Sequence, residues 1–92
     1  MSAESRMRET LMVGLEPTRL DIINESELHA GHRSSPGTGD SHFRLLIVSP
    51  KFEGKSRVER HRMVNALLAP ELKRGVHALA LSTFAPGEAL PG

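Results

Sequence analysis

The chain has 92 residues, 38% hydrophobic content and a formal net charge of +1, which is typical of one small globular domain. It contains no cysteine, and this excludes disulfides, a cysteine nucleophile, a CxxC redox site and an all-cysteine zinc site. No apolar run approaches the roughly 18 residues of a membrane span, and the first residues lack a secretory hydrophobic region, so we expect a single cytoplasmic domain over residues 1–92.

The charge is unevenly distributed along the chain. Residues 1–50 carry five Lys/Arg against seven Asp/Glu, whereas residues 51–92 carry seven against four. Most of the positive excess lies in residues 51–62. Because the sequence pI of about 8.3 is below that of a strongly basic nucleic-acid-binding domain, a solvated helix face is the default interpretation of this basic segment.

The first 24 residues predict a helix followed by a strand. Met7, Leu11 and Leu15 recur at every fourth position with charges between them, which indicates a helix over about residues 3–13. In residues 19–24 apolar side chains alternate with charged ones, a pattern that favours a short, half-buried strand.

A loop and a second strand follow. Residues 28–41 are rich in Gly, Ser, Pro and Thr and have no periodicity, so they predict a mobile loop. Residues 42–49 alternate and then become apolar on both faces, as expected of a central strand. We expect this strand to pair antiparallel with residues 19–24.

The segment after Pro50 predicts a helix with a defined start. Ser56 and Glu59 have the spacing of a capping box, in which each side chain bonds the backbone of the other. The apolar residues that follow lie within one arc of a helix: Met63, Val64, Leu67 and Leu68. Because proline is favoured at a helix start, Pro70 predicts a further short helical turn, which Gly75 would end.

Residues 76–84 predict a third strand, which a helical crossover would make parallel to the second. On one face we expect His77 with two leucines. On the other we expect small alanines that allow a helix to lie close. The predicted fold class is therefore α+β, helix-strand-strand-helix-(short helix)-strand on a three-stranded mixed sheet, with an ordered core over about residues 3–84 and a frayed tail over residues 85–92.

Histidines are the main candidates for chemistry in this chain. His29 and His32 lie three residues apart in the predicted loop, which by itself is weak evidence for a zinc site. From the residues alone, His42 and His77 are best explained as structural side chains, while His61 is equally compatible with structure and recognition. No P-loop, GxSxG or dinucleotide fingerprint is present, so we expect a protein that is not an enzyme.

Four short motifs together carry a family resemblance. They are Asn24-Glu25-Ser26, Ser41-His42-Phe43, Phe52-x-Gly54 followed by Arg60-His61-Arg62, and Gly75-Val76-His77-Ala78-Leu79-Ala80-Leu81. In this order, over about residues 19–84, the chain resembles the BolA family. The resemblance implies a fold akin to the class II KH domain. It also implies partnership with monothiol glutaredoxins in iron–sulfur cluster handling, or a DNA-linked transcriptional role.

The resemblance implies His77 as one metal ligand and His29, five residues after Asn24, as the second, with His32 in reserve. These imidazoles would join a cysteine of a monothiol glutaredoxin and the cysteine of glutathione around a shared [2Fe–2S] cluster. The isolated protein would hold no cofactor. Because imidazole binds metal only when neutral, the complex should weaken in acid.

The resemblance also implies a surface that faces either the glutaredoxin or nucleic acid, formed by Phe52, Gly54, Lys55, Arg57, Arg60, His61 and Arg62. The leading hypothesis is a non-enzymatic adaptor for iron–sulfur cluster assembly, trafficking or iron regulation. The alternatives are a DNA-binding transcriptional regulator that uses basic residues 51–62 and a KH-like interaction module without metal. The free protein is expected to be a monomer or weak homodimer without membrane contact.

Overall fold

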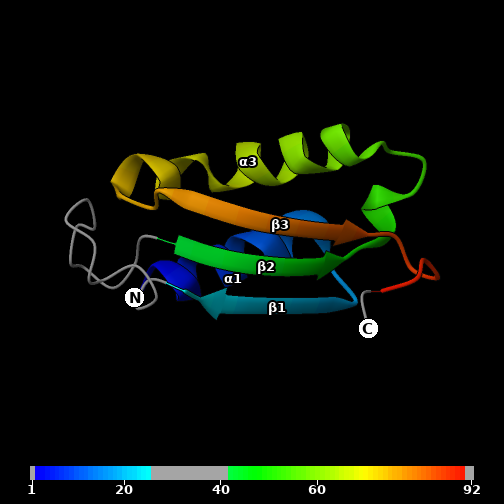
Figure 1. The fold of residues 1–92 in the computed structure, drawn as a ribbon, viewed down its shortest axis with the longest axis horizontal. Coiled ribbons are helices and arrows are strands. Elements are labelled where there is room, and N and C mark those ends of the chain that lie inside the picture. The colour runs from blue at the N-terminus through cyan, green and yellow to red at the C-terminus, as the bar shows by residue number, and fades with distance from the viewer. Residues whose placement is uncertain (1, 26–41, 91–92) are drawn as a thin grey trace.

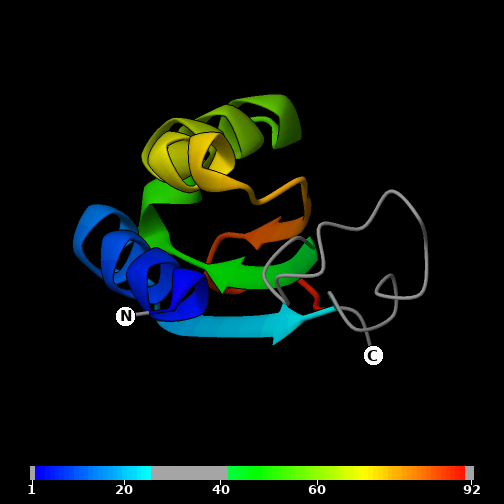
Figure 2. The same cartoon turned by 90° about the vertical axis from the view of Figure 1, so that its left-hand side faces the viewer.

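The computed structural model describes residues 2–25 and 42–90, which form two helices packed on one face of a three-stranded sheet (Figures 1 and 2). This confirms the predicted α+β class. In chain order the elements are α1 (Ala3–Leu15), β1 (Arg19–Asn24), β2 (His42–Val48), the 3-10 helix η1 (Pro50–Phe52), α3 (Arg57–Arg74) and β3 (Ala78–Phe84). Among the described residues, no helix covers the opposite face of the sheet.

Helix α1 buries a single stripe of side chains. Ser2 caps its start by accepting a hydrogen bond from the Ser5 amide, and Glu16 ends it in the left-handed conformation at φ 45°. The helix continues two residues past the predicted end. It passes through Gly14, where a Cβ would lie 2.9 Å from the Leu67 side chain, so the glycine permits a close approach of α1 and α3. The buried stripe consists of Ala3, Met7, Leu11 and Leu15.

The sheet has β2 at its centre, as predicted. β1 pairs antiparallel with β2, with Ile22 opposite Leu45. β3 pairs parallel with β2, with Leu81 opposite Leu45. The same face of all three strands therefore carries apolar side chains toward the helices. The predicted loop over residues 28–41 lies outside the described residues.

Helix α3 begins at the predicted capping box, in which Ser56 and Glu59 each bond the other's backbone. The prediction of a separate short helix at Pro70 is wrong, because α3 runs through this residue without a break to Arg74. A proline ring already holds φ near the helical value, so its main cost inside a helix is one missing N–H and a crowded carbonyl. A 3-10 turn does occur, but it is η1, which precedes α3.

The faces of β3 are reversed with respect to the prediction. Leu79 and Leu81 pack against the core, whereas Ala78 and Ala80 are exposed on the face without helices. The alternation also breaks before the strand begins, since Val76 is buried and the residue that follows it is exposed. The leucines take the inner face because burying their larger apolar side chains releases more free energy than burying alanine.

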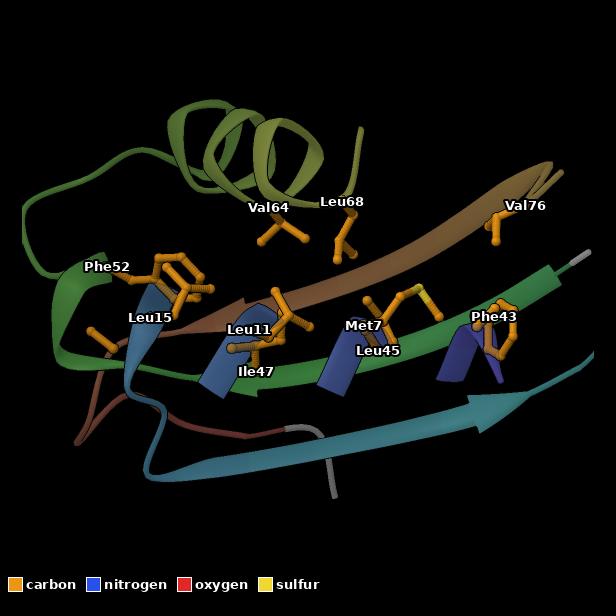
Figure 3. Packing of buried hydrophobic residues seen from close by; sticks show 12 residues of the cluster. Met7, Leu11, Leu15, Phe43, Leu45, Ile47, Phe52, Val64, Leu68 and Val76 are labelled. Carbon is orange, nitrogen blue, oxygen red and sulfur yellow. The ribbon is translucent and has the colours of Figure 1, made fainter. Parts of the chain in front are cut away.

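The core lies between the two helices and the sheet (Figure 3). Phe43 and Phe52 are its largest side chains, and both are completely enclosed. Phe43 extends from β2 near one end of the sheet, and Phe52 enters from η1 at the other. The two phenylalanines thus fill the ends of a core whose middle is aliphatic.

Candidate functional site

His77 lies in the short connection between α3 and β3. The amide of Val76, the preceding residue, donates a hydrogen bond to the Glu71 carbonyl at 3.1 Å, and the Val76 side chain is buried. His77 itself is exposed. The connection is therefore anchored from inside while it presents the imidazole to solvent.

The ring of His77 stacks on that of His42, with centroids 6.2 Å apart and an interplanar angle of 23°. His42 is the first residue of β2 and pairs with Ala78 across the parallel ladder. The sequence pattern favours a structural role for His42 and does not predict its position beside His77. The signal was available, because a strand that begins at His42 and a parallel strand that starts directly after His77 bring the two histidines together. His29 and His32 lie outside the described residues.

Two histidine side chains lie together at this end of the sheet. His42 and His77 offer imidazole nitrogens, and the chain has no cysteine to add a thiolate. Within residues 2–25 and 42–90, no group of three or more His, Asp or Glu side chains could hold a metal ion. A site completed by thiolates from a second molecule fits these residues, whereas a complete site from the described residues alone does not.

The basic segment lies at the other end of the sheet (Figure 1). β2 starts at His42 and leads into η1, and its seven residues span about 20 Å at about 3.3 Å per residue. α3 then starts beside η1 and returns to the histidine end. The predicted metal ligand His77 and the predicted partner surface over residues 51–62 are therefore not parts of one compact site.

Two members of the predicted partner surface have internal positions. The Phe52 ring is fully buried, so the prediction that it lines the surface is wrong. Arg60 lies beside that ring, with its guanidinium carbon 5.8 Å from the ring centroid. The Nε of Arg60 donates to the carbonyls of Phe52 and Lys55, and Nη1 donates to the carbonyl of Thr83. The sequence offered no signal for these bonds, because they join segments that meet only in the folded chain.

Arg60 also holds the start of the C-terminal segment. It makes two hydrogen bonds to Glu88, at 2.7 and 2.9 Å, and Glu88 accepts a third from the Ala85 amide. These bonds, led by those from Arg60, lower the pKa of Glu88 to about 2. The bond to Glu88 in turn raises the pKa of Arg60. Residues 85–88, the first part of the predicted frayed tail, are therefore bonded to α3 through Glu88.

The other members of the predicted surface are accessible to different degrees. Lys55, Arg57 and Arg62 are exposed, and Gly54 forms the turn before α3 with φ 74°. His61 is half-buried. It lines a pocket of about 220 Å³ together with Arg57 and residues 81–84 of β3.

Comparison with known proteins places this fold in a family. Residues 11–88 match the family described as BolA-like protein. The chain belongs to the BolA-like family. This confirms the resemblance inferred from its motifs, and the match covers the end of α1, all of α3 and all three strands.

Three relatives are informative. An uncharacterized Sinorhizobium protein encoded in the cobS 5' region is 51% identical over 89 residues, 96% of each chain. The solved BolA domain of SufE1 from Arabidopsis thaliana superposes with a TM-score of 0.86 at 44% identity, covering 97% of this chain and 98% of that one. The DNA-binding transcriptional regulator BolA of Escherichia coli is 38% identical over 84 residues, 91% of this chain and 76% of that protein.

The BolA-like unit also occurs within longer proteins. The chain is 45% identical over 87 residues to the SufE-like protein 1 of Arabidopsis thaliana, covering 90% of this chain but 24% of that protein. In the part of the BolA-like chain that the structure describes, neither helix combines the length and apolar character needed to cross a bilayer.

Proposed function

We propose that this BolA-like protein is a non-enzymatic adaptor that binds a monothiol glutaredoxin and co-ligates a [2Fe–2S] cluster. The observation that carries the proposal is the exposed His77, anchored through Val76 and stacked on His42, in a chain without a thiolate. Such a chain supplies imidazoles but no thiolate, so an iron–sulfur cluster bound to it needs a partner that supplies sulfur ligands. A monothiol glutaredoxin with glutathione supplies two thiolates.

Ligation by two imidazoles on one iron raises the reduction potential of such a cluster above that of an all-thiolate one. The contribution of this chain is to position the rings. The β2–β3 ladder sets the spacing between His42 and the start of β3, and the buried Val76 limits the movement of His77. Preorganised ligands lose less conformational entropy when a metal centre forms.

The second imidazole has three candidates. The family resemblance assigns it to His29, with His32 in reserve. His42 joins them because its ring already lies beside that of His77. Single substitutions of His29, His32 and His42 would identify the second ligand, because only the loss of a ligand should change the visible spectrum of the cluster.

The decisive experiment mixes the protein with a cluster-loaded monothiol glutaredoxin and glutathione and follows the visible circular dichroism spectrum. We expect a heterocomplex whose spectrum differs from that of the glutaredoxin homodimer. H77A should abolish that difference. E9A is the control, because it truncates an exposed side chain of α1 that belongs neither to the predicted ligands nor to the predicted partner surface, and it should retain the spectrum. An unchanged spectrum with H77A would contradict the assignment.

A second candidate function is DNA binding through the basic segment over residues 51–62. It is favoured by the likeness to the Escherichia coli protein described as a DNA-binding transcriptional regulator. Because Arg60 is engaged by Glu88, the exposed cations Lys55, Arg57 and Arg62 would make the phosphate contacts. Three contacts predict that log K falls with log salt with a slope of about −3. A DNA affinity that does not depend on salt concentration, or that is unchanged when all three positive charges are removed, would argue against this function.

A further inference from the structure

Strand β3 forms one free edge of the sheet. Among the described residues the strand order is β1-β2-β3, so β3 has a neighbouring strand on one side only. Its seven residues, Ala78–Phe84, include no charged side chain and no proline, whereas β1 at the other edge carries Arg19 and Asp21. Proteins commonly protect an edge strand with charges or proline, because its unpaired backbone groups attract another strand. β3 lacks this protection.

The hydrogen bonds at the end of β3 show which of its backbone groups point to the free edge. In a strand, the N–H and C=O of one residue point to the same side, and those of the next residue point to the other side. The Phe84 carbonyl accepts a bond from the amide of Ser49, the residue after β2. The Thr83 carbonyl accepts instead from Arg60 on α3. The side of Thr83 is therefore the free edge.

Leu79 and Leu81 direct their backbone groups to this same edge, because they alternate with the residues that bond β2. No hydrogen bond to these groups occurs within residues 2–25 and 42–90. The two leucine side chains pack against the core but are only half-buried. An added strand would pair the free N–H and C=O groups and cover the exposed part of both leucines.

Helix α3 lies beside this edge (Figures 1 and 2). Arg57 and His61 of α3 and residues 81–84 of β3 line the pocket of about 220 Å³ between them. This volume is several times the roughly 30 Å³ that one water occupies in the liquid, so a side chain of an added strand fits. Arg57 is exposed and has no ion pair among the described residues. A carboxylate on the added strand would complement its charge.

The charge of α3 selects among the possible occupants of the edge. The helix carries five Lys/Arg against two Glu. Two copies of this chain paired antiparallel through β3 would place two such helices side by side, which like-charge repulsion disfavours. A single-stranded nucleic acid has the opposite charge but no alternating N–H and C=O groups to form a ladder. An extended acidic peptide meets both requirements.

We propose that the free edge of β3 binds an extended peptide segment of a partner protein as a fourth strand. The peptide carries apolar side chains at alternate positions and a carboxylate next to Arg57. This pairing goes beyond the cluster proposal and uses none of the candidate metal ligands, so the failure of one proposal leaves the other standing.

The test begins with a selection on the whole chain from a phage-displayed library of random heptapeptides, which match the seven residues of β3. We expect enrichment of sequences with alternating apolar residues and an Asp or Glu. At saturation, a synthetic peptide of the enriched sequence should slow amide hydrogen exchange at Leu79 and Leu81 about tenfold or more. The amides of Ala80 and Ser82, which point to β2, should already be protected in the free chain.

Methylated peptides test the backbone pairing directly. One peptide is N-methylated at its odd-numbered amides and another at its even-numbered amides. Only the set that faces β3 should weaken binding, by about tenfold or more, because its hydrogen bonds are lost. The other set is the matched control. On the protein side, R57Q should weaken binding about threefold, as expected for an exposed ion pair. R8Q removes the same charge from an exposed position of α1 and should leave the affinity unchanged.

Three results would overturn the proposal outright: no enrichment, equal weakening by the two methylated peptides, or binding without protection of Leu79 and Leu81. Protection of these amides that rises with the concentration of the free chain would assign the edge to a second copy. Displacement of the peptide by a single-stranded deoxyoligonucleotide that protects the same amides would assign it to nucleic acid. Either of these assignments would also overturn the proposal.

Discussion

The Glu71 carboxylate links α3 to α1. The Glu71 side chain on α3 is 8% exposed and accepts a 2.9 Å bond from Nε of Arg6 on α1, with Arg74 at 3.7 Å. The bond from Arg6 leads the interactions that lower the pKa of Glu71, against the opposing effect of burial. One oxygen of Glu71 has no hydrogen-bond partner in the described structure. The carboxylate therefore depends on Arg6 to offset its burial.

This pair predicts a pH-dependent stability. The folded-state pKa of Glu71 is below its ordinary value of 4.5, so the stabilisation is complete above that value and is lost as the pH falls through the folded pKa. E71Q should lower the free energy of unfolding by about 1–2 kcal/mol at neutral pH. Urea unfolding should show this difference narrowing in acid below pH 4.5. E9Q, at an exposed position of α1, is the control, and a difference that persists unchanged at low pH would contradict the linkage.

Helix α3 contains Pro70 in its interior, although proline is favoured at the start of a helix. Pro70 lies on the exposed side of the helix, and Val64 and Leu68 before it and Glu71 after it are all buried. The packing of these residues on both sides of the proline keeps the helix in register. Tertiary contacts thus outweigh the loss of one backbone hydrogen bond.

P70A distinguishes a continuous helix from two separate ones. In a continuous helix the alanine restores an N–H and removes a ring that crowds the preceding turn. We expect a gain in the free energy of unfolding of about 1 kcal/mol or more, after allowing for the entropy that proline removes from the unfolded chain. Thermal and urea unfolding would measure it. A neutral or destabilising effect would indicate that Pro70 begins a separate helix.

At the scale of the whole molecule, the sheet separates two candidate functional ends. The stacked His42 and His77 lie where β2 and β3 begin, and the basic segment over residues 51–62 lies where β2 ends. The rigid ladder between them spans about 20 Å. A partner that supplies thiolates at the histidine end would therefore leave the exposed cations at the other end accessible.

Local pattern and the motifs of the BolA-like family together determined most of this architecture. Three patterns each depend on neighbouring residues: the four-residue spacing of Met7 and Leu11, the Ser56–Glu59 capping box and the alternation in β1. Such local signals predict elements and their pairing without knowledge of distant contacts. Local reasoning also favoured a short helix at Pro70, and the family resemblance implied a surface position for Phe52; the structure contradicts both.

Tertiary structure alone decided which side chains are available for binding. Arg60 and Arg57 look equivalent in the sequence, but Arg60 is bound by Glu88, 28 residues later in the chain. Arg57, in contrast, is exposed and has no ion pair among the described residues. His42 gained its place beside His77 from the register of two strands separated by a helix. Sequence specifies which groups the chain carries, but their partners come from contacts between distant segments, which no local pattern encodes.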